Sequence, residues 1–171
     1  VENLPGERII PVTYMNSTAD IKALCGKHGG IVCTSSNARQ VMDWAYERGD
    51  KVVFFPDEHL GRNTGLTMGI ALEEMTLWNP FQPLGGNTTV QLERAKLILW
   101  RGRCSVHTRF TVNQIRSARL QHPSVKVIVH PECPMETVQE ADFNGSTEYI
   151  IRTVTESPPG SVWAIGTEIN L

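Results

Sequence analysis

Short apolar runs separated by helix-forming stretches constrain this chain more than any other feature. The runs are rich in β-branched residues and cover residues 9–14, 51–55, 97–100, 126–130 and 161–165. Nearly continuous apolar runs of this length are typical of strands buried on both faces, as in parallel sheets. Helix signals lie between them: Ser17 or Thr18 opens one helix, Asn37 opens another that ends before Gly49, and Thr111 with Gln114 forms a capping box. This alternation predicts an α/β layered fold that binds ligands beyond the carboxyl ends of its strands.

The order of these elements repeats along the chain. Residues 12–61 can be aligned with residues 127–171, so that Tyr14 meets His130, Asn16 meets Glu132, Ser35 meets Ser146, and Asp57 falls near Thr167. Each of these positions follows a predicted strand or begins a predicted helix. The repeat predicts two copies of one small α/β domain that face a common site about a pseudo-symmetry axis.

The segment from Leu66 to Gly102 interrupts the repeat. Residues 77–87 contain two prolines and two glycines and are expected to form a long loop, which leads to a helix at 88–96 and the strand at 97–100. We therefore predict a domain at 1–102 with a long insertion at 66–96, and a second, shorter domain at 103–171. The second copy ends soon after its last predicted strand, at residues 161–165.

Charge and composition exclude several classes of protein. Sixteen Lys and Arg residues against 18 Asp and Glu residues give a net charge of −2, so a polybasic nucleic-acid or membrane binder is excluded. No apolar run is long enough to span a membrane, and the N-terminal segment is too charged for a secretory signal. A soluble, cytoplasmic protein is expected. The four cysteines are scattered and form no CxxC pair, so reduced thiols are expected in place of a disulfide framework or a zinc site.

Cys104 is the first candidate for chemistry. It directly follows Arg103, with Arg101 two residues before that, and His107 comes three residues later, just before a predicted helix. Cationic neighbours and a helix N-terminus favour the thiolate, the form that binds metal or acts as a nucleophile. A buried structural cysteine is the alternative.

Further polar residues follow the other predicted strands. Pro131 ends a strand and is expected to turn His130 and Glu132 outward, either as an acid/base pair or as a surface ion pair. Ser/Thr/Asn clusters at 34–38 and 144–147 begin helices, where they can cap the helix or hold a carboxylate or phosphate. Asp57 and Glu58 fit a helix N-terminus, and His59 is expected to be solvated.

Seven segments together resemble, in order, the central and following portions of the quinolinate synthase family. They are YMNSTADIKAL, VCTSSNA, FFPDEHLGRNTG, GRCSVHTRFT, VIVHPECP, ADFNGSTEYII and IGTE. The resemblance implies three homologous α/β domains around a pseudo-threefold axis, of which two are present here. It also implies a [4Fe–4S] cluster held by one cysteine from each domain. The implied reaction condenses iminoaspartate with dihydroxyacetone phosphate to quinolinate in NAD biosynthesis, with loss of phosphate and water, and one iron without a protein thiolate serves as a Lewis acid.

The resemblance assigns roles residue by residue. Cys104 corresponds to the second cluster ligand, Cys33 and Cys133 correspond to non-ligand positions, and Cys25 has no assigned role. Tyr14, His130 and Glu132 are the implied proton donors and acceptors. The substrate-binding set that it implies is Tyr14, Met15, Asn16, Ser35, His107, His130, Pro131, Glu132, Ser146 and Thr147.

The family's first domain and the third cluster ligand are absent from this sequence. One cysteine cannot hold a cluster that needs three, so the chain is expected to be a fragment that is inactive without the missing domain. Two other functions stay open: a non-catalytic module that binds a small dicarboxylate or phosphate ester, and a thiol enzyme that uses Cys104 with His107.

We expect Tyr14, Ser35, His130, Glu132 and Thr147 to converge on one cleft. The anionic substrates need local positive potential in an acidic protein. His130, two arginines beside Cys104 and the helix amides after the Ser/Thr/Asn clusters are the expected sources.

Overall fold

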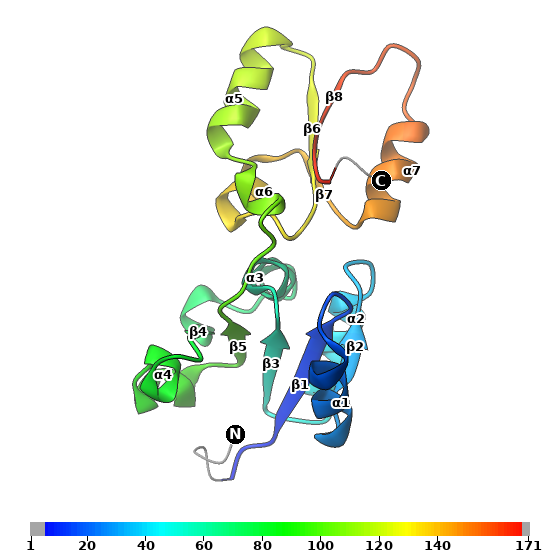
Figure 1. Cartoon of the computed structure of the whole chain (residues 1–171). Helices are drawn as coiled ribbons and strands as arrows, with labels where there is room; N and C mark the ends of the chain where they lie inside the picture. The colour runs from blue at the N-terminus through cyan, green and yellow to red at the C-terminus, as the bar shows by residue number, and fades with distance from the viewer. Residues whose placement is uncertain (1–5, 169–171) are drawn as a thin grey trace. The chain divides into compact units, whose positions relative to one another are not determined.

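The computed structural model describes residues 6–168, which form two compact units. Unit 1 spans Val1–Gly102 and unit 2 spans Arg103–Leu171, and each is described by itself (Figure 1). Both units are α/β structures with parallel sheets, as the strand–helix alternation predicts.

Unit 1 contains a five-stranded parallel sheet in the order β2-β1-β3-β5-β4. Its strands are β1 (Ile9–Tyr14), β2 (Ile31–Cys33), β3 (Lys51–Phe55), β4 (Met75–Trp78) and β5 (Leu97–Trp100). The three strands predicted from this part of the sequence, β1, β3 and β5, are confirmed and lie side by side in the sheet. The two edge strands, β2 and β4, were not predicted.

Within the described residues of unit 1, four α-helices accompany this sheet: α1 (Ala19–Lys27), α2 (Ala38–Tyr46), α3 (Glu58–Thr67) and α4 (Thr89–Arg94). Helix α2 buries Val41, Met42 and Ala45 in the main core. Helix α3 packs closely on the strands because Gly61 has no side chain: a Cβ there would lie 2.6 Å from the Cδ2 atom of Leu99. The predicted helix starts at Thr18 and Asn37 are confirmed as the residues that precede α1 and α2.

Two expectations in unit 1 are wrong in part. The loop expected at residues 77–87 is shorter, because its first residues belong to β4 and Pro83–Gly86 forms the 3₁₀ helix η2. His59 is not solvated, since only 13% of its side chain is exposed. Asp57 caps α3 as expected: its Oδ1 atom accepts a hydrogen bond from the Leu60 amide at 2.7 Å.

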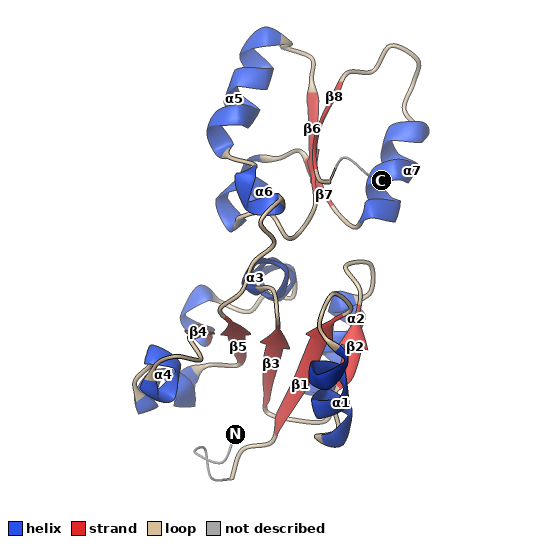
Figure 2. Cartoon of the chain, in the orientation of Figure 1, coloured by secondary structure: helices blue, strands red, loops and turns tan. Residues whose placement is uncertain are grey.

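Unit 2 is a small three-layer structure around a three-stranded parallel sheet in the order β7-β6-β8. Figure 2 shows α7 across the sheet from α5 and α6. Its elements are the 3₁₀ helix η3 (His107–Arg109), α5 (Val112–Gln121), β6 (Lys126–Val129), α6 (Met135–Glu140), β7 (Phe143–Asn144), α7 (Thr147–Thr155) and β8 (Trp163–Gly166). The predicted capping box of α5 is confirmed: Thr111 Oγ1 accepts from the Gln114 amide, and Gln114 Oε1 accepts from the Thr111 amide.

The sheet order supports the internal repeat. The order β7-β6-β8 in unit 2 matches β2-β1-β3 in unit 1, with the first strand of each copy in the middle and all pairs parallel. In such a sheet all carboxyl ends meet at one edge, and residues that follow the strands gather there. This edge of unit 2 carries the candidate site.

Candidate functional site

A tight turn brings Cys104 and His107 to the same side of their loop. The amide and the hydroxyl of Thr108 both donate to the carbonyl oxygen of Cys104, at 3.2 and 3.0 Å. This turn leads directly into η3, which His107 begins. The turn thus brings the two residues of the CxxH segment, Cys104 and His107, close together in space.

A second turn places His130 and Glu132 after β6. The His130 amide still donates to the carbonyl oxygen of Gly166 on β8, at 3.0 Å. Pro131 has no amide hydrogen, so the ladder stops there, and the Cys133 amide closes the turn by donating to the His130 carbonyl oxygen at 3.0 Å. The turn keeps both side chains close to the sheet edge.

His107, His130 and Glu132, which we call the His–Glu cluster, lie in contact. The two imidazole rings stack with centroids 4.6 Å apart and an interplanar angle of 23°. The Oε2 atom of Glu132 lies 3.4 Å from Nδ1 of His107 and 3.3 Å from Nδ1 of His130. All three residues are at least 95% buried. The expected outward orientation of His130 and Glu132, and the surface ion pair among its alternatives, are therefore wrong.

Both imidazoles are held in the neutral form. Burial lowers the pKa of His130 to about 3, and the neighbouring His107 acts in the same direction. Burial also lowers the pKa of His107, against a weaker opposing effect of Glu168. The carboxylate of Glu132 favours an imidazolium, but Nδ1 of His130 already accepts a hydrogen bond from the Glu132 amide at 3.3 Å, which only an unprotonated nitrogen can do. Neutral rings can both donate and accept a proton near pH 7.

Cys104 lies beside this cluster. One ligand atom each from Cys104, His107 and Glu132 lie within 4.8 Å of one another. The Nδ1 atom of His107 has no hydrogen-bond partner among the described residues, although it is buried. A thiol, an imidazole and a carboxylate in one group are donors suited to a transition metal.

The other three cysteines are not part of such a group of possible metal ligands among the described residues. Of the four, all within the described residues, Cys104 alone is not fully buried. Burial raises the pKa of Cys25 to about 11 and that of Cys33 to about 12, which keeps them as thiols. The Cys133 thiol donates to the carbonyl oxygen of Gly166 at 3.6 Å. Among the described residues, Cys104 is therefore the cysteine whose sulfur could serve as a metal ligand, and a single such thiolate would fit one ligand position of an iron–sulfur cluster.

Ser146 and Thr147 begin α7 in the same unit. Ser146 is buried, and its Oγ atom accepts from the Tyr149 amide at 3.3 Å, so the capping interpretation of this residue is confirmed. Thr147 is half-buried at the first position of the helix. Its contact with a ligand stays a prediction.

The predicted residues of unit 1 follow β1 and β2. Tyr14 is buried as the last residue of β1 and pairs in register with Cys33. Met15 and Asn16 are exposed in the turn that follows, and Ser35 is half-buried between β2 and α2. Their convergence with the residues of unit 2 stays a prediction.

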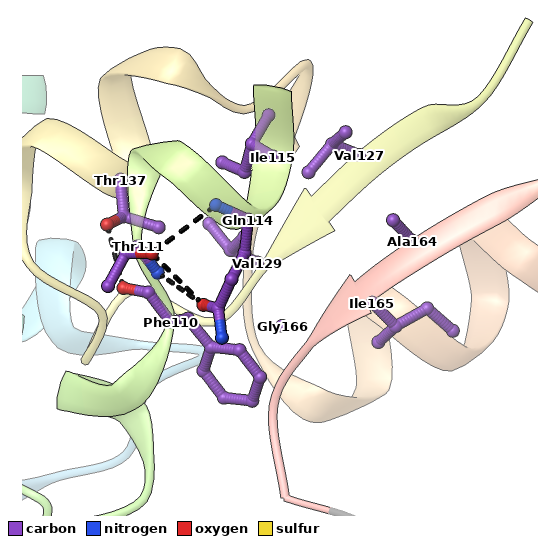
Figure 3. Close-up of a pocket in the computed structure, with 10 residues that line it drawn as sticks. All are labelled: Phe110, Thr111, Gln114, Ile115, Val127, Val129, Thr137, Ala164, Ile165 and Gly166. Atoms are coloured by element: carbon purple, nitrogen blue, oxygen red, sulfur yellow. Dashed lines mark hydrogen bonds between the residues drawn. The ribbon is translucent and has the colours of Figure 1, made fainter. Parts of the chain in front are cut away.

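An apolar pocket of about 230 Å³ lies between α5 and the sheet of unit 2 (Figure 3). Its lining within the described residues includes no titratable side chain, and it excludes the His–Glu cluster. The lining residues are Phe110, Thr111, Gln114, Ile115, Val127, Val129, Thr137, Ala164, Ile165 and Gly166. It has the character of an unfilled part of the core and not of a polar active site.

Comparison with known proteins decides the family. The sequence matches the family described as Quinolinate synthetase A protein over residues 1–171. The chain belongs to the quinolinate synthetase A family. It is 61% identical to the quinolinate synthase of Corynebacterium glutamicum over 165 residues, and 55% identical to that of Rhodopirellula baltica over 171 residues. These alignments cover 96% and 99% of this chain, but 42% and 44% of the relatives. The quinolinate synthase of Bacillus subtilis is 50% identical, with 100% of this chain and 46% of the relative covered.

The chain thus spans less than half the length of the quinolinate synthases that it matches. Within the part of the chain that the structure describes, no helix is long and apolar enough to cross a membrane.

One residue beside the candidate site, Thr167, was not among the predicted site residues. Its Oγ1 atom lies 3.2 Å from Nε2 of His107. The alignment of Thr167 with Asp57 at a strand tip was the one signal in the sequence that could have identified it.

Proposed function

We propose that this chain supplies part of the active site of a quinolinate synthase, which condenses iminoaspartate with dihydroxyacetone phosphate and releases phosphate and water. The observation that carries the proposal is the group formed by Cys104 and the His–Glu cluster at the strand tips of unit 2. Because the chain covers 42–46% of its relatives, the complete activity requires the remainder of the protein.

Cys104 would provide one of three thiolate ligands of a [4Fe–4S] cluster. When bound, such a cluster supplies a Lewis-acidic iron where it lacks a protein thiolate. The remaining two ligands would come from outside this chain, since Cys25, Cys33 and Cys133 are buried.

The His–Glu cluster would move protons in the condensation. Enolisation, imine formation and dehydration each need a donor and an acceptor at the reacting atoms. His130 accepts a hydrogen bond at Nδ1, so its neutral ring carries the proton on Nε2 and can donate it. Glu132 provides the acceptor, and burial of all three side chains excludes bulk water from them.

The helix N-terminus of α7 would hold an anionic group of a substrate. Its first amides carry partial positive charge, and Thr147 adds a hydroxyl group there. Tyr14, Met15, Asn16 and Ser35 of unit 1 would complete the substrate site, Tyr14 as a further proton donor.

The test uses the complete protein that contains this chain, prepared without oxygen. Iron, acid-labile sulfide and quinolinate formation are measured for the wild type, Cys104→Ser and Cys133→Ser. We expect Cys104→Ser to lose both iron and activity and Cys133→Ser to retain iron. Full iron content and activity in Cys104→Ser would refute the proposal. Substrate binding by a wild-type protein that never contains iron would favour the binding module instead.

A further inference from the structure

Strand β8 of unit 2 corresponds to β3 of unit 1, but it lies at the edge of its sheet. The repeat aligns Tyr14 with His130. The residue four positions before each of them pairs with Val52 in β3 and with Trp163 in β8, so these two residues match. Strand β3 pairs with β1 on one side and with β5 on the other, whereas β8 pairs with β6 alone among the described residues.

The free edge of β8 carries main-chain groups that can pair with a further strand. The carbonyl oxygen of Gly166 accepts a hydrogen bond from the residue after β6 at 3.0 Å, so Gly166 faces β6. Because alternate residues of a parallel strand form hydrogen bonds to opposite sides, the amides and carbonyls of Trp163 and Ile165 face the free edge. In unit 1 the matching amide of Val52 donates to the carbonyl oxygen of Lys96, directly before β5, at 2.9 Å.

Two isoleucines of unit 2 are exposed, although their counterparts in unit 1 are buried. Ile165, two residues after Trp163, is 42% exposed, whereas its counterpart Phe54 is 0% exposed. Ile151 is the fifth residue of α7 and is 48% exposed. Its counterpart Met42, the fifth residue of α2, is 0% exposed. Unit 2 therefore leaves uncovered an apolar surface that unit 1 buries.

Ile165 and α7 lie on the same face of the unit 2 sheet. On the other face, Val127 and Val129 of β6 pack with Ile115 of α5. Ile128 lies between these valines and pairs with Ile165, and side chains alternate along a strand. Both isoleucines therefore point to the face that α7 covers in part.

In unit 1, α3 and β5 cover the corresponding surface. Helix α3 contacts α2, and a Cβ atom at its Gly61 would lie 2.9 Å from the ring carbon Cδ1 of Phe54. Leu60 of α3 is fully buried in the same core as Met42 and Phe54. Among the described residues, unit 2 has no helix or strand after β8 that could take these places.

We propose that Ile151, Ile165 and the free edge of β8, together called the β8 face, bind a further helix and parallel strand of the same protein from outside residues 1–171. The occupant resembles α3 and β5: a helix with a small residue against Ile165, and an apolar strand that continues the sheet. The relatives have the chain length for it, because 1–171 matches only 42–46% of them. The inference concerns how unit 2 is completed and does not depend on the reaction.

Amide hydrogen exchange, followed by NMR in chain 1–171 and in the complete protein, tests the proposal. Within each molecule the protection factors of Trp163 and Ile165 are compared with that of Ala164, whose main chain faces β6 in both. In chain 1–171 we expect Trp163 and Ile165 to be at least about 100-fold less protected than Ala164, at every protein concentration. In the complete protein we expect all three to agree within about 10-fold.

Two results would overturn the proposal. Low protection of Trp163 and Ile165 in the complete protein would show that no strand pairs with β8. Protection in chain 1–171 that increases with protein concentration would assign the β8 face to a second copy of the chain. The complete protein decides the matter even if chain 1–171 does not fold alone.

A substitution at Ile151 tests the helix of the occupant. In the complete protein, Ile151→Lys should lower the protection of Trp163 and Ile165 relative to Ala164 at least about 10-fold, because a charge would lie under the covering helix. Leu120→Lys is the matched control, since it changes an exposed leucine of α5 on the other face of the sheet and should leave these values unchanged. Wild-type protection in Ile151→Lys would overturn the assignment of a covering helix.

Discussion

Protonation of His130 should make the stability of this protein fall in mild acid. The ring is 2% exposed, and its folded-state pKa of about 3 lies far below the unfolded value near 6.5. Between these values the unfolded chain binds a proton that the folded protein does not bind. The free energy of unfolding therefore rises with pH across this window, and the contribution of neutral His130 is lost progressively below about pH 6.5.

The loss in free energy of unfolding at pH 5 depends little on the folded-state pKa of His130. While the folded ring stays neutral, the free energy of unfolding falls by about 1.4 kcal/mol for each pH unit below the unfolded pKa. Because pH 5 lies about 1.5 units below that pKa, His130 accounts for a loss of roughly 2 kcal/mol. A folded-state pKa one unit higher would change this by less than about 0.1 kcal/mol. His107 contributes in the same direction, because burial lowers its pKa as well.

The assay is urea unfolding at pH 7.5 and pH 5, followed through the amide signals of β6 and β8 so that unit 2 is observed. We expect the wild type to lose at least about 2 kcal/mol between these pH values and His130→Gln to lose about 2 kcal/mol less. His122→Gln, which removes an exposed histidine of the same unit, should behave like the wild type. Equal pH dependence in the wild type and His130→Gln would refute the reasoning, because the folded protein would then bind the proton at His130 as readily as the unfolded chain.

Three further results are expected. Iodoacetamide should alkylate Cys104 of the native chain well before the buried Cys133, as peptide mass mapping would show, and equal rates would contradict the burial argument. Lys51→Met should lower the free energy of unfolding of unit 1 by about 3 kcal/mol in urea titrations, because the buried ammonium group donates to two main-chain carbonyls at 2.6 and 2.7 Å. Ser146→Ala should cost unit 2 about 1 kcal/mol through loss of the α7 cap, whereas Thr147→Ala should cost clearly less.

The central strands and the helix starts could be predicted because their signals are local. Strand β1 has the predicted bounds, and the Thr111 capping box forms as the sequence indicates. Strands β2, β4 and β7 were missed because they are two to four residues long and lie at sheet edges. The apolar run of β2, Ile31–Cys33, is only three residues long, which is too short to indicate a strand by its pattern, and pairing with β1 makes it one.

The candidate site was predictable in its residue types but not in its environment. Cys104, His107, His130 and Glu132 were all identified from their positions after strands or before a helix. Their burial depends on how two separate turns pack against each other, which no local pattern encodes. The contact of His107 with Thr167 spans 60 positions and is a product of the tertiary fold.

The neutral histidines change which groups of unit 2 could attract the anionic substrate of the proposed function. His130 was an expected source of positive potential, but a ring with a pKa of about 3 carries no charge at neutral pH, so this expectation is wrong. The described sources that remain in this unit are the exposed guanidinium group of Arg103 and the amides that begin α7. In the proposed function, holding the anion and moving protons would therefore fall to different groups. In that proposed function, the His–Glu cluster would exchange protons without changing the field that holds the anion, as long as each exchange is completed within the cluster.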